Sequence, residues 1–188
     1  RLSLVGSEMC IRDRNNRYSS YKWIKHSIGN RQSLINDQVN SIIEDSDGDL
    51  WFGTNNGISL LNSKTGQWRS FLSSFEKNQD SRSHIFTTLC EVLPGVVWAG
   101  GYFSGIYQID KRSSNVSYFT PASYAYENIR PDKYIRDIRK DSQGNIWSGG
   151  FYNLKRINVH TKNIQLYHGL NSITAILERD AKSMWIGS

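Results

Sequence analysis

Aromatic and amide side chains recur at one position of a repeated pattern, and their chemistry suits ligand binding. Two residues of this kind lie four and five places after each of three tryptophans. The pairs are Asn55 and Asn56, Tyr102 and Phe103, and Phe151 and Tyr152. Aromatic faces stack on the CH groups of a sugar, and amides bond its hydroxyls. Two more rings, Tyr124 and Tyr126, lie in the stretch 121–131. We expect these eight residues to bind a ligand; the alternative is that the rings cover sheet edges.

A second group of candidate residues is acidic. Asp45, Asp47 and Asp49 alternate as in a calcium loop, but that loop needs glycine at position six and glutamate at position twelve. Leu50 and Asn56 occupy those positions here. The aspartates are therefore interpreted as turn residues whose carboxylates accept hydrogen bonds from backbone amides.

The remaining titratable residues do not indicate catalysis. His26, His84, His160 and His168 share no metal-ligand spacing. The linear order shows no Ser-His-Asp or paired-carboxylate arrangement. The chain is therefore predicted to be no enzyme and to hold no metal or cofactor.

The elements that must position the candidate residues follow from an internal repeat. A Trp-x-Gly unit recurs four times, with an apolar residue nine and twelve places before each tryptophan. The units are Trp51 and Gly53, Trp98 and Gly100, Trp147 and Gly149, and Trp185 and Gly187. The period is about 40–50 residues, which is typical of repeat architectures. The rings are expected to fill the space between neighbouring sheets, and the glycines to let the next sheet approach.

Each unit holds four short apolar segments separated by Gly, Asn and Asp turns, which predicts four strands. The fold class is therefore all-β: a β-propeller fragment of about three complete four-stranded blades, with partial blades at both ends. The predicted units are 15–35 (end of a preceding blade and a linker), 36–82 (blade 1), 83–132 (blade 2), 133–169 (blade 3) and 170–188 (the first half of blade 4). Such an open arc is expected to expose apolar sheet faces at both ends, and to aggregate or unfold when made alone.

The repeat resembles the two-component regulator propeller family. The positions of that motif are held by Val39, Ile42, Asp45, Gly48, Trp51, Gly53, Thr54, Gly57 and Ile58, and again by Ile135, Ile138, Asp141, Gly144, Trp147 and Gly149. The resemblance implies a periplasmic sensor, the ectodomain of an inner-membrane hybrid histidine kinase, that detects oligosaccharides or another small ligand for signal transduction. Its implied partners are that ligand and the rest of the parent sensor chain, including a homodimer. Contact with the membrane would come only through a transmembrane helix outside this sequence, and kinase activity would also lie elsewhere.

Two other functions stay open at this point. A propeller can serve as a protein-interaction or dimerisation scaffold. A lyase-type propeller enzyme, similar to the streptogramin lyases, would instead bring histidine and glutamate side chains together at the central channel.

Composition narrows the partners further. The 188 residues carry a net charge of +6 without a long Lys/Arg run, so nucleic-acid binding is not expected. No stretch approaches the ~20 apolar residues of a membrane span. Residues 3–14 resemble a translated sequencing adapter, so 1–14 are expected to be an artefact outside the fold. That leaves Cys90 as a single thiol in an apolar strand.

Overall fold

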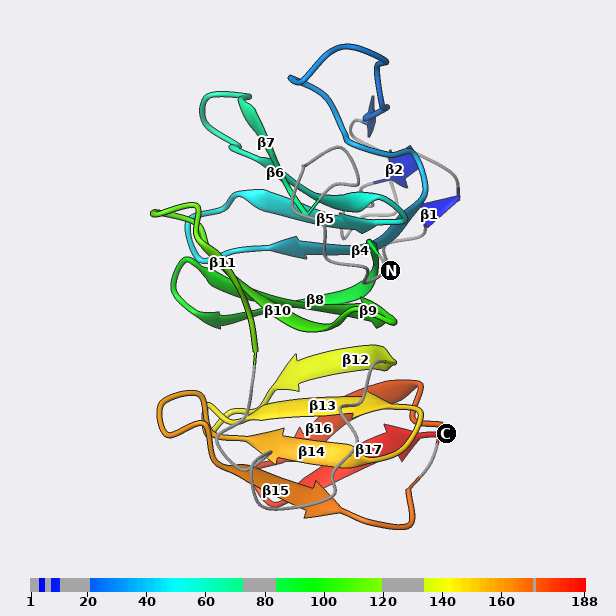
Figure 1. Cartoon of the computed structure of the whole chain (residues 1–188), viewed down its shortest axis with the longest axis vertical. Coiled ribbons are helices and arrows are strands. Elements are labelled where there is room, and N and C mark those ends of the chain that lie inside the picture. The colour runs from blue at the N-terminus through cyan, green and yellow to red at the C-terminus, as the bar shows by residue number, and fades with distance from the viewer. Residues whose placement is uncertain (1–3, 6–7, 11–20, 73–83, 120–133, 171) are drawn as a thin grey trace, which may run out of the picture.

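The computed structural model describes residues 4–5, 8–10, 21–72, 84–119, 134–170 and 172–188. Within these residues it consists of antiparallel β-sheets and contains no helix (Figure 1). The all-β prediction is confirmed. Since no helix is present in the described part, none there could cross a membrane.

Four sheets follow the chain, and each is formed by strands consecutive in sequence. Sheet 1 contains β4 (Val39–Glu44), β5 (Leu50–Thr54), β6 (Gly57–Leu61) and β7 (Trp68–Phe71). Sheet 2 contains β8 (Ile85–Leu93), β9 (Val96–Tyr102), β10 (Gly105–Asp110) and β11 (Val116–Tyr118). Sheet 3 contains β12 (Ile135–Lys140), β13 (Ile146–Gly150), β14 (Leu154–Ile157) and β15 (Ile164–Tyr167). Sheet 4 contains β16 (Ala175–Asp180) and β17 (Ser183–Gly187).

The sheets stack in chain order, as Figure 1 shows from sheet 1 in cyan to sheet 4 in red. The first strand of each sheet contacts the first strand of the next, so β4 packs on β8, β8 on β12 and β12 on β16. The turns between strands therefore emerge along two opposite sides of the stack, where the strands end. This arrangement brings equivalent turns of neighbouring sheets together.

The segment before sheet 1 adds a small sheet. Its strands are β1 (Leu4–Val5), β2 (Glu8–Cys10) and β3 (Tyr21–Trp23), in the order β1-β2-β3. The structure thus places residues 4–5 and 8–10, which were expected to lie outside the fold, in paired β-strands. An unpaired strand edge offers its main-chain donors and acceptors to any extended segment. The artefact origin of 1–14 and the unit boundaries stay predictions.

The outer face of sheet 1 is covered by residues that follow β3. Ile24 and Leu34 are buried and pack against Phe52 and Leu61 of the sheet. The expectation of an exposed apolar face at this end is therefore wrong, because residues 24–34 fold back over it.

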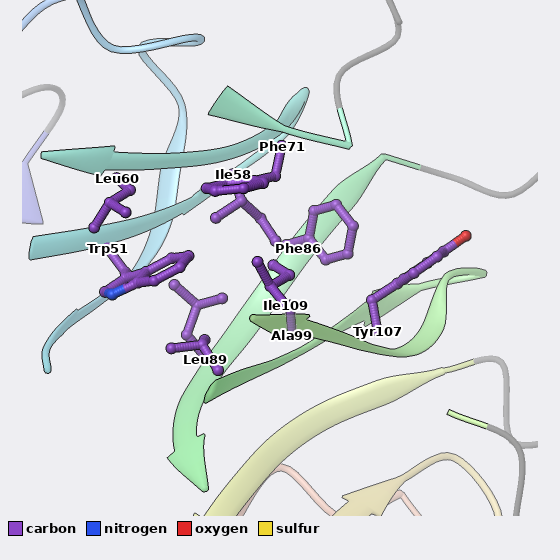
Figure 2. Close-up of a cluster of buried hydrophobic side chains, with 10 residues drawn as sticks. Trp51, Ile58, Leu60, Phe71, Phe86, Leu89, Ala99, Tyr107 and Ile109 are labelled. Atoms are coloured by element: carbon purple, nitrogen blue, oxygen red, sulfur yellow. The ribbon is translucent and has the colours of Figure 1, made fainter. Parts of the chain in front are cut away.

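The core between sheets 1 and 2 is built around Trp51. Its indole stacks on Phe71 of β7, with ring centroids 5.6 Å apart. Phe86 and Leu89 of β8, the apolar residues twelve and nine places before Trp98, pack in the same cluster (Figure 2). The apolar positions before one tryptophan thus contribute to the core around the preceding one.

The same packing recurs once per sheet, until the last. Trp51, Trp98 and Trp147 are 0%, 1% and 9% exposed, whereas Trp185 is 59% exposed. The predicted packing role is confirmed for the first three tryptophans. Trp185 is exposed because no described sheet covers its face of sheet 4, which agrees with the expected exposed apolar face at this end of the arc.

The glycines two places after the tryptophans lie where sheets approach each other. A Cβ added at Gly100 would come within 2.5 Å of Ile135 Cγ2, and one at Gly149 would overlap Ile173. At Gly53 it would meet the carbonyl oxygen of Phe86 at 3.2 Å. The predicted role of these three glycines is confirmed.

The acidic turn of sheet 1 binds both its own backbone and the indole. Asp45 Oδ1 accepts hydrogen bonds from the amides of Asp47 and Asp49, each at 3.0 Å. Its Oδ2 accepts one from Trp51 Nε1 at 2.8 Å. Sheet 3 repeats the arrangement with Asp141, whose acceptor atoms bind the amides of Gln143 and Asn145 and the Nε1 of Trp147. The turn interpretation is confirmed, and the indole bond is an addition to it.

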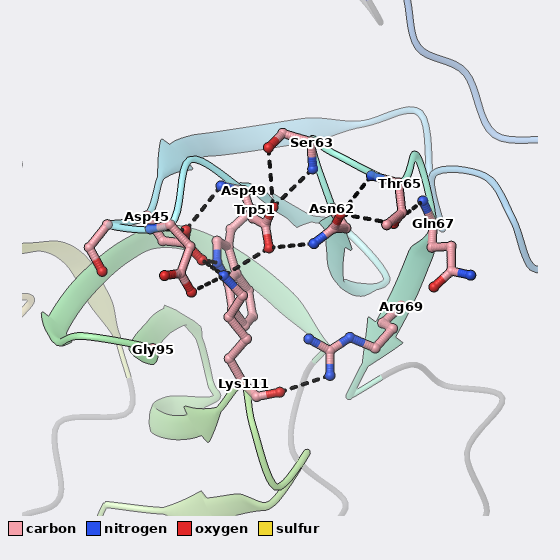
Figure 3. Close-up of polar contacts among 12 residues, drawn as sticks. Asp45, Asp49, Trp51, Asn62, Ser63, Thr65, Gln67, Arg69, Gly95 and Lys111 are labelled. Carbon is pink, nitrogen blue, oxygen red and sulfur yellow. Dashed lines mark hydrogen bonds and ion pairs between the residues drawn. The ribbon is translucent and has the colours of Figure 1, made fainter.

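Lys111, which directly follows β10, joins this turn to sheet 2 through ion pairs. Its Nζ lies 2.7 Å from Asp45, 2.8 Å from Asp47 and 2.8 Å from Asp49 (Figure 3). Lys111, Asp45 and Asp49 are all buried. The ammonium group thus occupies the space among three carboxylates that resemble the start of a calcium loop. We call these four residues the lysine–aspartate cluster.

Charge pairing in the lysine–aspartate cluster shifts the pKa values of Asp45, Asp49 and Lys111. Burial alone would raise the pKa of Asp45 and of Asp49, but hydrogen bonds from Lys111 and from neighbouring groups outweigh it and hold both pKa values below the ordinary range. For Lys111, burial opposes the charge, and the three carboxylates nevertheless raise its pKa above the usual value. The side chains of Lys111, Asp45 and Asp49 are therefore charged at neutral pH.

A second polar contact between sheets also recurs. Glu91 of β8 accepts hydrogen bonds from the amide and the hydroxyl of Ser46, at 2.8 and 2.9 Å. Glu178 of β16 accepts the same pair from Ser142, at 2.9 and 2.6 Å. Both serines directly follow the turn aspartate, so each acidic turn is held by the first strand of the next sheet.

Candidate functional site

The turn between the second and third strands of sheets 2 and 3 carries exposed aromatic rings. Tyr102 ends β9 and Phe103 follows it before β10, and Phe151 and Tyr152 lie between β13 and β14. They are 41%, 53%, 44% and 48% exposed, in that order. Large rings that remain this exposed contribute little to the core and are available to a ligand.

A fifth ring joins the two turns. Tyr134, directly before β12, has its ring centroid 4.4 Å from that of Phe103 and 6.0 Å from that of Tyr102. Its centroid is also 5.9 Å from Phe151, which lies 5.0 Å from Tyr152. We call these five residues the aromatic patch. It is continuous across the boundary between sheets 2 and 3.

Tyr134 was not among the residues that the sequence pattern selected. A signal for it exists in the repeat, because the main chain before the first strand bonds the same turn in two sheets. The amide of Phe151 donates to the carbonyl of Tyr134 at 3.3 Å, and the amide of Asn55 donates to that of Gln38 at 3.1 Å. Gln38 and Tyr134 both stand thirteen places before a tryptophan. This position therefore belongs to the same surface as the turn.

The backbone at Phe103 is strained. Its φ is 56°, in the left-handed region that bulky residues avoid. A residue held there costs of order 1–3 kcal/mol, and such residues cluster at functional sites. Gly105, two places further on, has a φ of 66°, which glycine adopts without this cost.

The predicted asparagines make polar contacts at the equivalent turn of sheet 1. Asn55 Oδ1 accepts a hydrogen bond from Asn40 at 2.8 Å, and Asn55 Nδ2 donates to Gln38 at 2.5 Å. The amide nitrogen of Asn56 bonds Thr54 Oγ1 at 3.1 Å. The contacts of Asn55 are thus with residues of its own sheet. The remaining two predicted residues, Tyr124 and Tyr126, lie outside the described residues.

Two of the four histidines bond main-chain carbonyls. His26 Nδ1 lies 2.7 Å from Leu34 O, and His84 Nδ1 lies 2.9 Å from Leu72 O. Across the segments that the structure covers, no group of three His, Cys, Asp or Glu side chains could hold a metal ion. The aromatic patch combines flat apolar ring faces with the phenolic hydroxyls of three tyrosines.

Comparisons with known proteins agree with the repeat. The family model "Two component regulator propeller" matches residues 33–56 and 129–152. Over 90 residues the chain is 31% identical to Histidine kinase P4 of Formosa agariphila, a match that covers 46% of this chain and 7% of that protein.

Two solved structures share the fold over nearly the whole chain. The extracellular domain of the hybrid two component system BT3049 from B. thetaiotaomicron matches with a TM-score of 0.73 and 23% identity, covering 97% of this chain and 24% of that one. The extracellular domain of BT4673 from the same organism matches with a TM-score of 0.67 and 20% identity, covering 96% and 25%. The chain therefore spans about a quarter of each solved domain.

These likenesses confirm the propeller fold predicted from the tryptophan repeat. The two stretches matched by the family model include the acidic turn of each matched repeat, with Asp45 and Asp141. Two stretches of this chain therefore match the repeat of the two component regulator propeller family.

Proposed function

We propose that this chain is part of the extracytoplasmic sensing propeller of a hybrid two-component regulator. The proposal is supported by the family of its repeats and by a fold shared with extracellular domains of hybrid two component systems. In this role the chain carries no catalysis of its own. It binds a ligand and passes the change through the parent sensor chain, acting there as one of two copies. The periplasm is the proposed location.

The proposed ligand is an oligosaccharide, and the aromatic patch is its proposed site. The observation that carries this assignment is a row of five adjoining rings, four of them exposed, over two sheets. A sugar ring offers CH faces to such a surface and hydroxyls to the phenols of Tyr102, Tyr134 and Tyr152. Since the patch spans two sheets, it favours a ligand of several sugar units over a single one.

The test is a glycan array followed by calorimetry on the complete ectodomain that contains this chain. We expect binding of an oligosaccharide that weakens about fivefold or more when Tyr102 or Phe151 is changed to alanine, since truncating a central binding residue costs more than about 1 kcal/mol. Trp23→Ala is the matched control, because Trp23 is also exposed, at 48%, but lies on β3 away from the patch. If no oligosaccharide on the array bound the ectodomain, the ligand assignment would be contradicted.

A further inference from the structure

The first strands of sheets 1, 2 and 3 each contain a β-bulge at the same position of the repeat. The register shifts around Asn40 in β4, Thr87 in β8 and Arg136 in β12. Each of these three residues stands eleven places before a tryptophan. A bulge re-aims the side chain that it carries, and such bulges are common next to functional sites.

The bulge residues of sheets 1 and 2 are hydrogen-bonded to the next sheet. Asn40 Nδ2 donates to the carbonyl of Phe86 at 3.1 Å and also to Asn55 Oδ1 at 2.8 Å. Thr87 Oγ1 donates to the carbonyl of Ile135 at 2.9 Å. In sheet 1 the bulge side chain thus reaches both the next sheet and the turn that carries Asn55.

Arg136 occupies the same position but has no such partner. Its Nε atom is buried and without a hydrogen bond, and among the described residues its guanidinium group has no ion-pair partner. The residue as a whole is half-buried, and arginine stays charged in proteins. Because a charge that is partly removed from water is unfavourable unless it is paired, this position favours an anion.

The acidic residue next in sequence does not supply that anion. Asp137 is buried, and its Oδ2 accepts a hydrogen bond from the amide of Ile176 at 2.8 Å. Its Oδ1 lies 3.1 Å from Arg139 Nε and 3.5 Å from Thr88 Oγ1. The carboxylate of Asp137 is thus bound to sheets 2 and 4 and to another arginine.

The repeat places Arg136 at the edge of the aromatic patch. Arg136 follows Tyr134 by two places, and the carbonyl of Tyr134 accepts a hydrogen bond from the amide of Phe151 at 3.3 Å. In sheet 1 the bulge residue bonds Asn55, which holds the turn position that Phe151 holds in sheet 3. An unpaired positive charge therefore stands beside exposed rings.

We propose that Arg136 binds an anionic group of the ligand, so that the oligosaccharide of the aromatic patch is an acidic one. This assignment rests on the proposed function and narrows its substrate class. The guanidinium group offers a rigid fork of N–H donors that fits a carboxylate, such as that of a uronic acid, and charged oxygens of a sulfate ester accept the same bonds. The rings hold the CH faces of the sugar, and Arg136 selects its charge.

The experiment uses the complete ectodomain and an array of three oligosaccharide classes: uronic-acid, sulfated and neutral. The best acidic ligand is then compared by calorimetry with its own neutral form, made by carboxyl reduction or by desulfation, which also identifies the charged group. We expect the acidic form to bind at least about tenfold more tightly, because the neutral form leaves the guanidinium group without its partner.

The variant Arg136→Gln should bind the acidic form at least about tenfold more weakly and the neutral form about as well as the wild type does. Unchanged binding of the neutral form also shows that the variant is folded. Arg136→Lys keeps the charge but loses the planar fork, so its affinity should lie between those of the wild type and Arg136→Gln. Arg112→Gln is the matched control: it removes the same charge from an exposed residue in the turn between β10 and β11 and should change the affinity less than about twofold.

Equal binding of the acidic and neutral forms would overturn the proposal and leave the oligosaccharide site in place. An equal loss for both forms in Arg136→Gln would also overturn it, because Arg136 would then hold a carboxylate of the parent chain and shape the site. A loss no larger than that of Arg112→Gln would have the same meaning for the proposal. If no oligosaccharide of any class bound, the proposed function itself would fail, and this assignment with it.

Discussion

Replacing Lys111 by methionine tests how strongly adjacent sheets are joined by charge. The substitution keeps the length and apolar stem of the side chain and removes the ammonium group from three carboxylates. Two of these, on Asp45 and Asp49, are 5% and 2% exposed. Removing one partner of a buried ion pair leaves an uncompensated charge and costs about 3–5 kcal/mol. We expect Lys111→Met to lose a free energy of unfolding in that range at pH 7.

The pH dependence of this loss has a definite sign. Because the folded-state pKa values of Asp45 and Asp49 are lowered, their contribution to stability is present above the unfolded value of about 3.9 and is lost as pH falls through the folded values. Because the pKa of Lys111 is raised, its contribution is present below the unfolded value of about 10.4 and is lost as pH rises through the folded value. The difference between wild type and Lys111→Met should therefore be largest between these limits and shrink below pH 4.

The assay is urea unfolding followed by tryptophan fluorescence at pH 7 and below pH 4. Lys64→Met is the matched control, because Lys64 is exposed and should change stability by less than about 0.5 kcal/mol. Equal stabilities of Lys111→Met and Lys64→Met at pH 7 would refute the reasoning, as would a loss that grows on acidification.

Three further predictions concern packing, strain and reactivity. Gly100→Ala should lower the free energy of unfolding by about 1–3 kcal/mol because its Cβ would meet Ile135. Gly187→Ala is the control, because its Cβ would meet nothing closer than 3.5 Å and should leave stability unchanged. Equal melting temperatures of the two variants would contradict this prediction. Phe103→Gly should remove the strain of a left-handed φ at a bulky residue, raising the free energy of unfolding by up to about 1 kcal/mol while weakening ligand binding. A loss of stability would argue against strain at this turn. Burial raises the pKa of Cys90 to about 11, so alkylation of Cys90 at pH 8 should be much slower than that of a free thiol until urea unfolds the chain. Rapid labelling of Cys90 in the folded chain, read by peptide mass spectrometry so that Cys10 is counted separately, would contradict it.

The local elements could be predicted from sequence because their signals are local. Apolar segments separated by Asp, Asn and Gly turns predict four strands per unit, and residues 36–82 contain the four strands β4 to β7. The Trp-x-Gly spacing also predicts the ring packing and the close approach at Gly100 and Gly149, since each depends on one repeated position.

The contacts between sheets could not be predicted from the sequence pattern because they join residues far apart in the chain. Lys111 reaches back 66 residues to Asp45. The first strands also contain bulges, at Val39/Ser41 and Phe86/Thr88, that the apolar pattern does not reveal. Each bulge re-aims a side chain to the next sheet: Asn40 donates to Phe86 O at 3.1 Å, and Thr87 donates to Ile135 O at 2.9 Å.

The candidate site was predicted in part. The exposed rings at the turns of sheets 2 and 3 follow from their offset to the tryptophans, but their continuity depends on Tyr134, which comes from the connection before β12. Asn55 has the same offset and bonds Gln38 and Asn40 instead. A short amide can satisfy its hydrogen bonds within its own sheet, whereas a large ring must find another ring or a ligand.

The most direct test of the account is the affinity of the complete ectodomain for its best array oligosaccharide after Tyr134→Ala. Tyr134 contacts rings from both turns, so its removal divides the aromatic patch while leaving Tyr102 and Phe151 on their own sheets. The account predicts at least a tenfold weaker affinity by calorimetry, with sheet packing retained in the near-ultraviolet circular dichroism spectrum. An unchanged affinity in a folded variant would contradict the claim that this surface binds the ligand.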